Sequence, residues 1–446
     1  MKRLLTMLLC AVLAFGCVST ASAKTMQDCH RVTLTRQDTT QDNKSVIRVW
    51  QAKTAMQSVD NEIAQIQQEY VDRIGSALPK AANTTSKNSR LDVEVRYSRT
   101  GLTWLSFVVL ARTTYHRDLV GQELTTRTYD MTTGSRIRLT DIFASDSEGW
   151  EILEDAVRAK IIEYFPDEEP DAAALELACS RGQLEQTEFS LHGMSLVLHL
   201  LAEDFYPSHK TLIEVPVYYP QIRDYMTDWA QIETDNLSYY KTCAITFDDG
   251  PARTNTTTVL NSLLETGTVA TFFVVGNRIS SYQDLVQREH DEGHAIGSHN
   301  WHHGTPDKSS AGSLRAMPGK VNAAMIKAIG IPVRYDRVPY GLYNTMIKAG
   351  VDWAYIQWSM DTYDWRGRTP TTILKNVKKS ISDGDIILCH DIKDYASQTT
   401  VKLVEYLVEE GYLFLTVDEL FAKDGVTLQP GHVYFHCDNG DTSIKK

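Results

Sequence analysis

The sequence predicts an α/β protein in which a smaller α+β domain precedes a domain built on a parallel sheet. Three observations lead to this prediction. The chain has 446 residues, of which 42% are hydrophobic and 23% charged, which is enough for two globular cores. Mixed helix and strand signals fill the first half. From Thr242 onward, short apolar strands alternate with helical stretches, a pattern typical of a parallel sheet that is open or closed as a barrel.

The first 23 residues have the features of a secretory signal peptide. Lys2 and Arg3 precede an apolar run over residues 4–15, and Ala23 ends a set of small residues that a signal peptidase reads. We therefore expect export and cleavage after Ala23. Lipoprotein processing at Cys17 is ranked second, because the residues before it fit that signal poorly. An uncleaved membrane anchor is the third alternative.

An accessory domain is expected over residues 46–235, after a polar and mobile tether over residues 24–45. Apolar residues recur every three or four positions over residues 59–78, which predicts an amphipathic helix. Apolar and polar residues alternate over residues 91–97, and residues 104–110 form an apolar run. Both patterns predict strands. A turn, a second helix and three closing strands are expected at 129–134, 151–164, 189–191, 196–201 and 212–217.

The second domain is expected over residues 240–422, followed by a C-terminal extension over 423–446. Its strands are predicted at 244–247, 270–275, 385–388 and 413–417, and its helices at 279–292 and 399–410.

The charge and the cysteine content of the chain disfavour nucleic acid as a partner and zinc-thiolate centres as a kind of site. The net charge of −12 disfavours a polyanion such as nucleic acid and favours a neutral or cationic partner. After cleavage five cysteines remain, and their spacing matches no zinc-thiolate pattern: Cys29, Cys179, Cys243, Cys389 and Cys437. We expect most of them to be buried thiols, with a Cys243–Cys389 disulfide as a minor alternative.

Two polar clusters follow predicted strands of the second domain. Asp248 and Asp249 end an apolar strand, and the turn at Gly250-Pro251 would let both carboxylates face one cavity. His299 and His303 are four residues apart, so one helical turn would place both imidazoles on one face. Two histidines and a carboxylate can form a metal site with positions open to water and substrate.

Each of these clusters alone is more often a turn or a surface loop than a site. His302 lies off the face that the other two histidines share, and we expect it at the surface or behind them. Three further clusters follow in the chain: Arg337-Val338-Pro339-Tyr340-Gly341, Asp361-Thr362-Tyr363-Asp364-Trp365 and Leu388-Cys389-His390.

With five such clusters in this order over about 145 residues, the chain resembles the polysaccharide deacetylase family (the NodB-homology domain, carbohydrate esterase family 4) across residues 240–422. The resemblance implies a distorted (β/α) barrel with catalytic groups at the carboxyl ends of its strands. It also implies a metal-dependent hydrolase that converts an N-acetyl group to an amine and acetate.

The family's roles can be carried over to matching positions. Asp249, His299 and His303 would hold a divalent ion, with zinc favoured and cobalt or nickel as alternatives. Asp248 would act as general base, and Arg337 would keep it ionised.

The remaining matching positions concern the substrate and the leaving group. The backbone amide of Tyr340 would stabilise the oxyanion. His390 would protonate the leaving amine while Asp364 holds its imidazolium, and Trp365 and Leu388 would form the wall of the acetyl pocket.

The chain departs from the family pattern at two positions. Asn300 stands where serine or threonine is usual, and we expect its side chain still to donate a hydrogen bond that fixes the loop. Val338 stands where proline is common, and we expect no chemical consequence.

In the first half, the segments 129–134, 139–143 and 214–217 resemble the extracytoplasmic domain shared by some peptidoglycan deacetylases and lysozyme-sensing anti-sigma factors. This resemblance favours peptidoglycan GlcNAc or MurNAc as substrate, with chitin oligomers second and O-acetylated xylan third. The alternative from another class is a non-catalytic protein that binds glycan strands or a lysozyme-like protein. The intact set of metal ligands and acid/base residues argues against that alternative.

Overall fold

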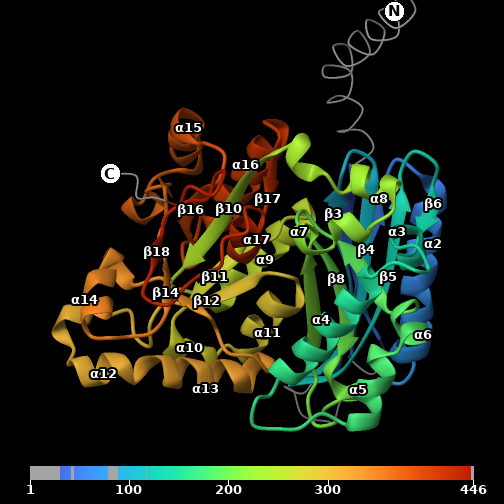
Figure 1. Ribbon diagram of the computed structural model, residues 1–446, viewed down its shortest axis with the longest axis horizontal. Coiled ribbons are helices and arrows are strands. Elements are labelled where there is room, and N and C mark those ends of the chain that lie inside the picture. The colour runs from blue at the N-terminus through green and yellow to red at the C-terminus, as the bar shows by residue number, and fades with distance from the viewer. Residues whose placement is uncertain (1–30, 42–44, 79–88, 117, 443–446) are drawn as a thin grey trace, which may run out of the picture.

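A computed structural model describes residues 31–41, 45–78, 89–116 and 118–442, in two parts that lie side by side (Figure 1). The signal peptide predicted for residues 1–23 and Cys29 lie outside the described residues. Within the described ranges, none of the helices has the length and apolar character needed to cross a bilayer.

The accessory part is mostly β-structure. A six-stranded sheet has its strands in chain order and is antiparallel except between β2 and β3. Its strands are β1 (Thr33–Thr40), β2 (Val46–Lys53), β3 (Ser89–Thr100), β4 (Trp104–Tyr115), β5 (Asp118–Asp130) and β6 (Ser135–Ile137). A second, antiparallel sheet contains β7 (Glu188–Leu191), β8 (Ser195–Leu201) and β9 (Leu212–Tyr218).

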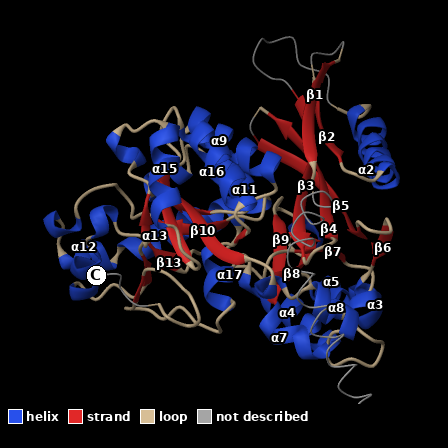
Figure 2. Ribbon diagram, turned by 90° about the horizontal axis from the view of Figure 1, so that it is seen from above, coloured by secondary structure: helices blue, strands red, loops and turns tan. Residues whose placement is uncertain are grey.

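Helices cover these sheets because each has one apolar face. Val59 and Ile63 of α2 pack on the six-stranded sheet, and α2 lies on the side away from the barrel (Figure 2). Leu153 and Val157 of α4 pack against the three-stranded sheet. The helices of this part are α2 (Gln57–Tyr70), α3 (Leu139–Ile142), α4 (Gly149–Glu163), α5 (Ala172–Cys179), α6 (Arg181–Leu184), α7 (Tyr219–Ile222) and α8 (Asp228–Glu233).

Strands β1, β2 and β5 of the accessory part were not predicted from the sequence. Residues 33–40, expected within a mobile tether, form β1 and pair with β2. Most of β1 is exposed, and a polar edge strand has the composition of a loop. The sequence predicts the turn over residues 129–134 but not the strand β5 before it. The residues of β5 are largely polar and partly exposed, so they lack the apolar pattern of a buried strand.

The second part is an α/β unit on one parallel sheet, which confirms the predicted fold class. The strand order is β15-β16-β10-β11-β12-β13-β14-β18, with β17 beside β10. In the described ladder β15 and β18 are end strands, so the sheet curls as a barrel that stays open on that side. The strands are β10 (Lys241–Asp248), β11 (Thr271–Val274), β12 (Ala295–Ser298), β13 (Tyr335–Asp336), β14 (Ala354–Ile356), β15 (Met360–Asp361), β16 (Asp385–His390), β17 (Tyr412–Phe414) and β18 (Val433–Tyr434).

Helices pack on the outside of this sheet. Val259 and Leu263 of α9 and Leu403 of α16 share one core with Ile245 and Phe247 of β10. The helices are α9 (Arg253–Thr266), α10 (Gly276–Ile279), α11 (Gln283–Asp291), α12 (Ala311–Arg315), α13 (Met317–Ile329), α14 (Tyr343–Lys348), α15 (Pro370–Ser380), α16 (Ala396–Glu409) and α17 (Val417–Ala422). Residues 423–442 continue this domain, since β18 extends the same sheet.

The four described cysteines are buried and free. Cys243 lies opposite Asp385 and Cys389 lies opposite Phe247, so the two thiols are four residue steps apart along neighbouring strands. At about 3.3 Å per residue this separation is too long for a disulfide. The minor alternative of a Cys243–Cys389 bond is therefore wrong.

Candidate active site

The carboxyl end of β10 delivers two carboxylates to one place. Asp248 is the last residue of the strand and is buried. We expected the chain to turn at Gly250-Pro251, but it already turns at Asp249, whose φ is +79°. Both carboxylates face His299, because Asp248 Oδ2 lies 3.9 Å and Asp249 Oδ1 lies 3.4 Å from His299 Nε2.

The two predicted histidine ligands come together, but not on a helix. His299 follows β12, and Asn300 has a left-handed φ of +60°, so residues 299–303 form a bend. The expected helical turn is wrong, although the ring centroids of His299 and His303 are only 5.0 Å apart. His302 is exposed and accepts a hydrogen bond at Nδ1 from Asn277 Nδ2 (2.9 Å), so it points away from this pair as expected.

Asn300 fixes the bend through its backbone rather than its side chain. Its backbone N–H donates to Ser298 Oγ (3.1 Å) and to Asp336 Oδ1 (3.2 Å). Among the described residues, neither polar atom of its carboxamide has a hydrogen-bond partner. The hydrogen bond that we expected from this side chain is therefore absent there. Asparagine suits the position because it tolerates the left-handed conformation.

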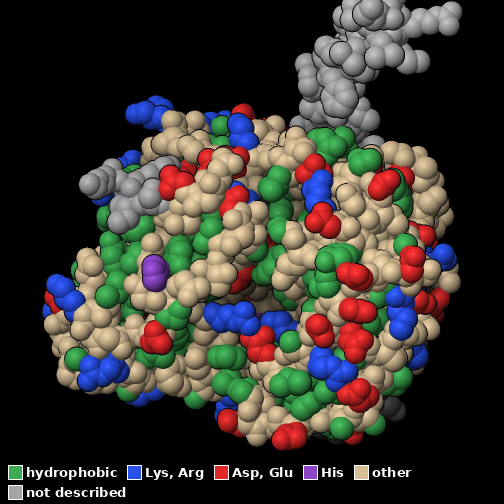
Figure 3. All heavy atoms as spheres, viewed as in Figure 1, with side chains coloured by type: hydrophobic (Ala, Val, Ile, Leu, Met, Phe, Trp, Pro, Cys, Tyr) green, Lys and Arg blue, Asp and Glu red, His purple; other side chains and the backbone are tan. Residues whose placement is uncertain are grey.

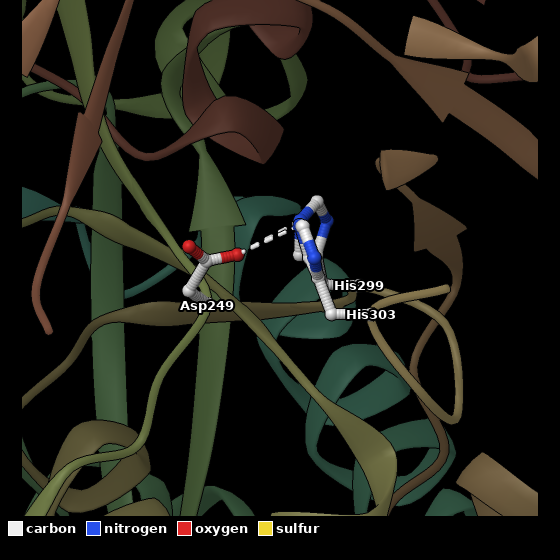
Figure 4. Close-up of side chains that lie close together, drawn as sticks. All are labelled: Asp249, His299 and His303. Atoms are coloured by element: carbon white, nitrogen blue, oxygen red, sulfur yellow. Dashed lines mark ion pairs between the residues drawn. The ribbon is translucent and has the colours of Figure 1, made fainter. Parts of the chain in front are cut away.

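Asp249, His299 and His303 present three donor atoms that lie within 4.8 Å of one another (Figure 4). Asp249 Oδ1 lies 3.0 Å from His303 Nε2, and this buried oxygen has no hydrogen-bond partner among the described residues. His299 donates from Nδ1 to the carbonyl oxygen of Arg337 (2.5 Å), which leaves its Nε2 for the cluster. One carboxylate oxygen and two imidazole nitrogens fit a zinc-type cation.

The charge of Asp249 is stabilised even without a cation. Burial alone would raise the pKa of its carboxyl, but the close contacts with the His299 and His303 rings and the charges of His299 and His390 outweigh burial and hold that pKa well below its usual range. Asp249 is therefore ionised, as a ligand must be.

Asp248 is tied to a different partner. The Arg337 guanidinium is fully buried and donates from Nη1 to Asp248 Oδ1 (2.8 Å) and to Thr246 Oγ1 (2.6 Å). It also lies 4.0 Å from the Phe273 ring centroid. The predicted pairing of Arg337 with Asp248 is present. It leaves Asp248 Oδ2 on the side of His299.

A carboxylate–imidazole pair lies at the end of β16. His390 donates from Nδ1 to Asp364 Oδ1 (2.7 Å), and its backbone N–H donates to Asp364 Oδ2 (2.7 Å). Burial lowers the pKa of His390, but the hydrogen bond to Asp364 and the charges of Asp364, Asp248 and Asp249 outweigh burial and raise that pKa to about 9. The imidazole is thus held protonated near neutral pH.

The predicted wall residues differ in exposure. Leu388 is buried two residues before His390, so both side chains lie on the same face of β16. Trp365 is 47% exposed, and Tyr340 is 62% exposed with its hydroxyl 3.3 Å from His303 Nδ1.

Two further acidic residues, for which the sequence predicted no role, position parts of this site. Asp336, next to Arg337, accepts the bond from Asn300 described above. Asp361 accepts hydrogen bonds from the Tyr363 backbone N–H (2.7 Å) and from Trp365 Nε1 (3.4 Å). Four of the seven described non-glycine residues with positive φ lie in this site: Asp249, Asn300, Tyr340 and Tyr363. Such strain gathers at functional sites, but sequence periodicity does not reveal it.

Comparison with known proteins agrees with this geometry. The sequence model of a family described as polysaccharide deacetylase matches residues 238–355. A peptidoglycan-N-acetylglucosamine deacetylase of Bacillus cereus is 36% identical over 190 residues, which cover 40% of this chain and 88% of the relative. The chain belongs to the polysaccharide deacetylase family.

Other polysaccharide deacetylases are similar over different lengths. The peptidoglycan-N-acetylglucosamine deacetylase PgdA of Listeria monocytogenes is 29% identical over 319 residues, 71% of this chain and 67% of the relative. This match is longer than the barrel, so it extends into the accessory part. The solved structure of the peptidoglycan deacetylase PdaC from Bacillus subtilis is 30% identical and covers 41% of this chain and 91% of that one, with a TM-score of 0.39.

Proposed function

We propose that this member of the polysaccharide deacetylase family is exported and removes N-acetyl groups from peptidoglycan, at GlcNAc or MurNAc. The observation that carries the proposal is the approach of Asp249, His299 and His303 to one another beside Asp248. The substrate class is supported by the names of the B. cereus and L. monocytogenes relatives, which act on peptidoglycan N-acetylglucosamine. Export rests on the signal-peptide features of residues 1–23.

The cation that we propose for the three donor atoms is zinc, with cobalt or nickel as alternatives. When bound, it would polarise the acetyl carbonyl and lower the pKa of water from about 16 toward about 7. His299 is buried and anchored through Nδ1, so its Nε2 is held in place for this role.

In this proposal Asp248 takes a proton from the attacking water. Its Oδ1 accepts a hydrogen bond from the buried Arg337 guanidinium, which fixes the orientation of the carboxyl group. Its Oδ2 remains available on the side of the ligand cluster. An ionised and oriented carboxylate is what a general base requires.

His390 would deliver a proton to the nitrogen of the leaving amine. Its raised pKa keeps the imidazolium present at neutral pH, and Asp364 fixes the ring so that Nε2 is free for the substrate. The Tyr340 backbone amide would donate to the oxyanion, and Trp365 and Leu388 would enclose the acetyl methyl group.

A substrate panel tests this function on the full mature chain, residues 24–446. Acetate release would be measured on purified peptidoglycan, chitin oligomers and acetylated xylan, with one equivalent of zinc. We expect the fastest release from peptidoglycan. A protein that binds the cation yet releases no acetate from any of the three would favour the alternative of a non-catalytic glycan- or lysozyme-binding protein.

A further inference from the structure

The loop after β15 carries two exposed aromatic rings and two arginines beside the proposed catalytic pair. Tyr363 and Trp365 have ring centroids 6.4 Å apart with an interplanar angle of 54°. The Arg366 guanidinium lies over both rings, with Cζ 4.8 Å from the Tyr363 centroid and 4.5 Å from that of Trp365. Arg368 lies 5.7 Å from the Tyr363 centroid. Two guanidinium groups therefore lie against this exposed pair of aromatic rings, Tyr363 and Trp365, which we call the rim.

The backbone of this loop is fixed. Asp361 holds the Tyr363 N–H and the Trp365 indole N–H, as described above. Tyr363 and Gly367 adopt left-handed φ values of +57° and +68°. The Arg366 N–H donates to the Tyr363 carbonyl (3.1 Å). The Arg366 side chain thus starts from a defined backbone position and needs little ordering when it binds a ligand.

The rim lies next to the reacting centre. Asp364 stands between the two aromatic residues, and it is this residue that holds His390. Asp361 is close enough to His390 for the imidazole charge to lower the pKa of its carboxyl, although burial raises that pKa overall. Arg366 is two residues from Asp364, so the two backbones lie within about 7 Å of each other.

The charge of Arg366 has no carboxylate partner within 4.0 Å among the described residues, and the same holds for Arg368. Most other arginines of the described chain have such a partner. A guanidinium stacked on a ring keeps its N–H edges free for a planar anion. The surrounding protein has a net charge of −12, so a local cation is needed where an anionic substrate approaches.

We propose that Arg366, stacked on Tyr363 and Trp365, forms a subsite for a carboxylate carried by the glycan next to the N-acetyl group that is removed. Muramyl residues supply this chemistry in two ways, through the lactyl ether or through the stem peptide. The subsite selects acidic over neutral glycans, and Arg366 is its specificity-determining residue. This inference rests on the proposed deacetylase function.

The test compares matched substrates on the full mature enzyme. The kcat and KM values for acetate release are measured on GlcNAc–MurNAc oligomers with free lactyl carboxylates, on the same oligomers as methyl esters, and on oligomers that carry stem peptides. We expect Arg366→Gln to reduce the preference in kcat/KM for acid over ester about two- to fivefold, through KM, which is the effect of losing one exposed charge pair. Raising the ionic strength should weaken the wild-type preference in the same direction.

Two variants make the result specific. Arg366→Lys keeps the charge but loses the planar stack, so it should retain part of the preference. Lys379→Gln removes one exposed positive charge near the C-terminal end of α15. At 1.5 Å per residue, Lys379 lies about 14 Å along the helix axis from Pro370, the first residue of α15. This variant should leave the preference unchanged.

The outcomes distinguish the two sources of the carboxylate, and they distinguish a failure of the subsite from a failure of the deacetylase function. A loss of preference with free lactyl oligomers assigns the carboxylate to the lactyl ether, and a loss only with stem peptides assigns it to the peptide. If Arg366→Gln leaves kcat/KM unchanged, relative to the methyl esters, for both the free lactyl oligomers and the stem-peptide oligomers, while wild-type enzyme releases acetate, the subsite is overturned. No acetate release by wild-type enzyme from any of these glycans overturns the proposed function and the subsite with it.

Discussion

Asp248 and Asp249 are neighbours in the chain, but their surroundings give them different roles. Asp249 faces two imidazoles, and Asp248 is bonded to a buried guanidinium. A carboxylate with an unpartnered buried oxygen can bind a cation, whereas one held by an arginine can accept a proton. The left-handed turn at Asp249 creates this separation of environments.

His303→Ala should strongly weaken cation binding without unfolding the protein, because this imidazole is a proposed ligand and its side chain is 36% exposed. Titration calorimetry with zinc should show affinity at least about 100-fold weaker, since even outer partners of ligands cost 10- to 100-fold. The matched control is His302→Ala, one residue away, whose imidazole hydrogen-bonds to Asn277 outside the cluster. Normal zinc binding by His303→Ala would remove His303 from the ligand set.

The pH dependence of activity should follow His390. The imidazole must be protonated to act as an acid, so kcat/KM should fall as the pH rises through about 9. Asp364→Asn removes the negative charge that helps to raise this pKa, while its carbonyl oxygen can still accept the hydrogen bond, so the alkaline limb should move to lower pH. A full pH–rate profile of both proteins measures the shift. An unmoved limb would mean that another group sets it.

At the scale of elements, the sequence predicts those strands whose apolar pattern is local. Strands β3, β4, β10 and β11 lie within or close to the expected segments, because their buried residues follow one another in the chain. The polar residues that follow β10, β12 and β16 also come together as expected, since parallel strands end at one edge.

Other features depend on contacts that are distant in the sequence. The bend at His299 is not helical because Asn300 is held in a left-handed conformation by Asp336, 36 residues away. The edge strand β1 exists because β2 supplies its hydrogen bonds, while its own composition is that of a loop. Periodicity within a short segment carries no information on either contact.

The first turn of α17 gives a prediction at this scale. Thr416 accepts a hydrogen bond from the Glu419 N–H (3.2 Å), and Glu419 accepts one in return from the Thr416 N–H (3.1 Å). Thr416→Ala should lower the free energy of unfolding by about 1 kcal/mol, and Thr416→Ser should nearly retain it. Urea denaturation of the three proteins measures this. Equal losses in both variants would show that the methyl group, rather than the cap, matters.

In the whole molecule, buried polar contacts join the two parts. Arg112 of β4 is 9% exposed and pairs with Glu94 of its own sheet, and also with Glu292 (3.4 Å) and Asp291 (3.9 Å) of the barrel domain. Tyr164 bonds His290 at 2.8 Å across the same boundary. On the face of the molecule shown in Figure 3, by contrast, acidic and basic side chains are interspersed. The accessory part is thus attached through charge pairs that are shielded from water.

Arg112→Leu should therefore destabilise the protein strongly, by about 3–5 kcal/mol, because it removes the cation that faces three buried carboxylates. The matched control is Arg73→Leu, which removes the exposed partner of Glu123, with side-chain exposures of 58% and 40%, and should cost less than about 1 kcal/mol. Thermal and denaturant unfolding of both variants would be compared. Equal effects would show that the buried cluster does not hold the two parts together.

The most direct measurement is acetate release by Asp248→Asn loaded with one equivalent of zinc. We predict full zinc binding, because Asp248 is not one of the three grouped donors, together with a rate about 10²–10⁴-fold below wild type, the usual loss for a general base. Full activity of the zinc-loaded variant, or loss of the zinc itself, would contradict the assignment of a cation site beside a separate carboxylate base.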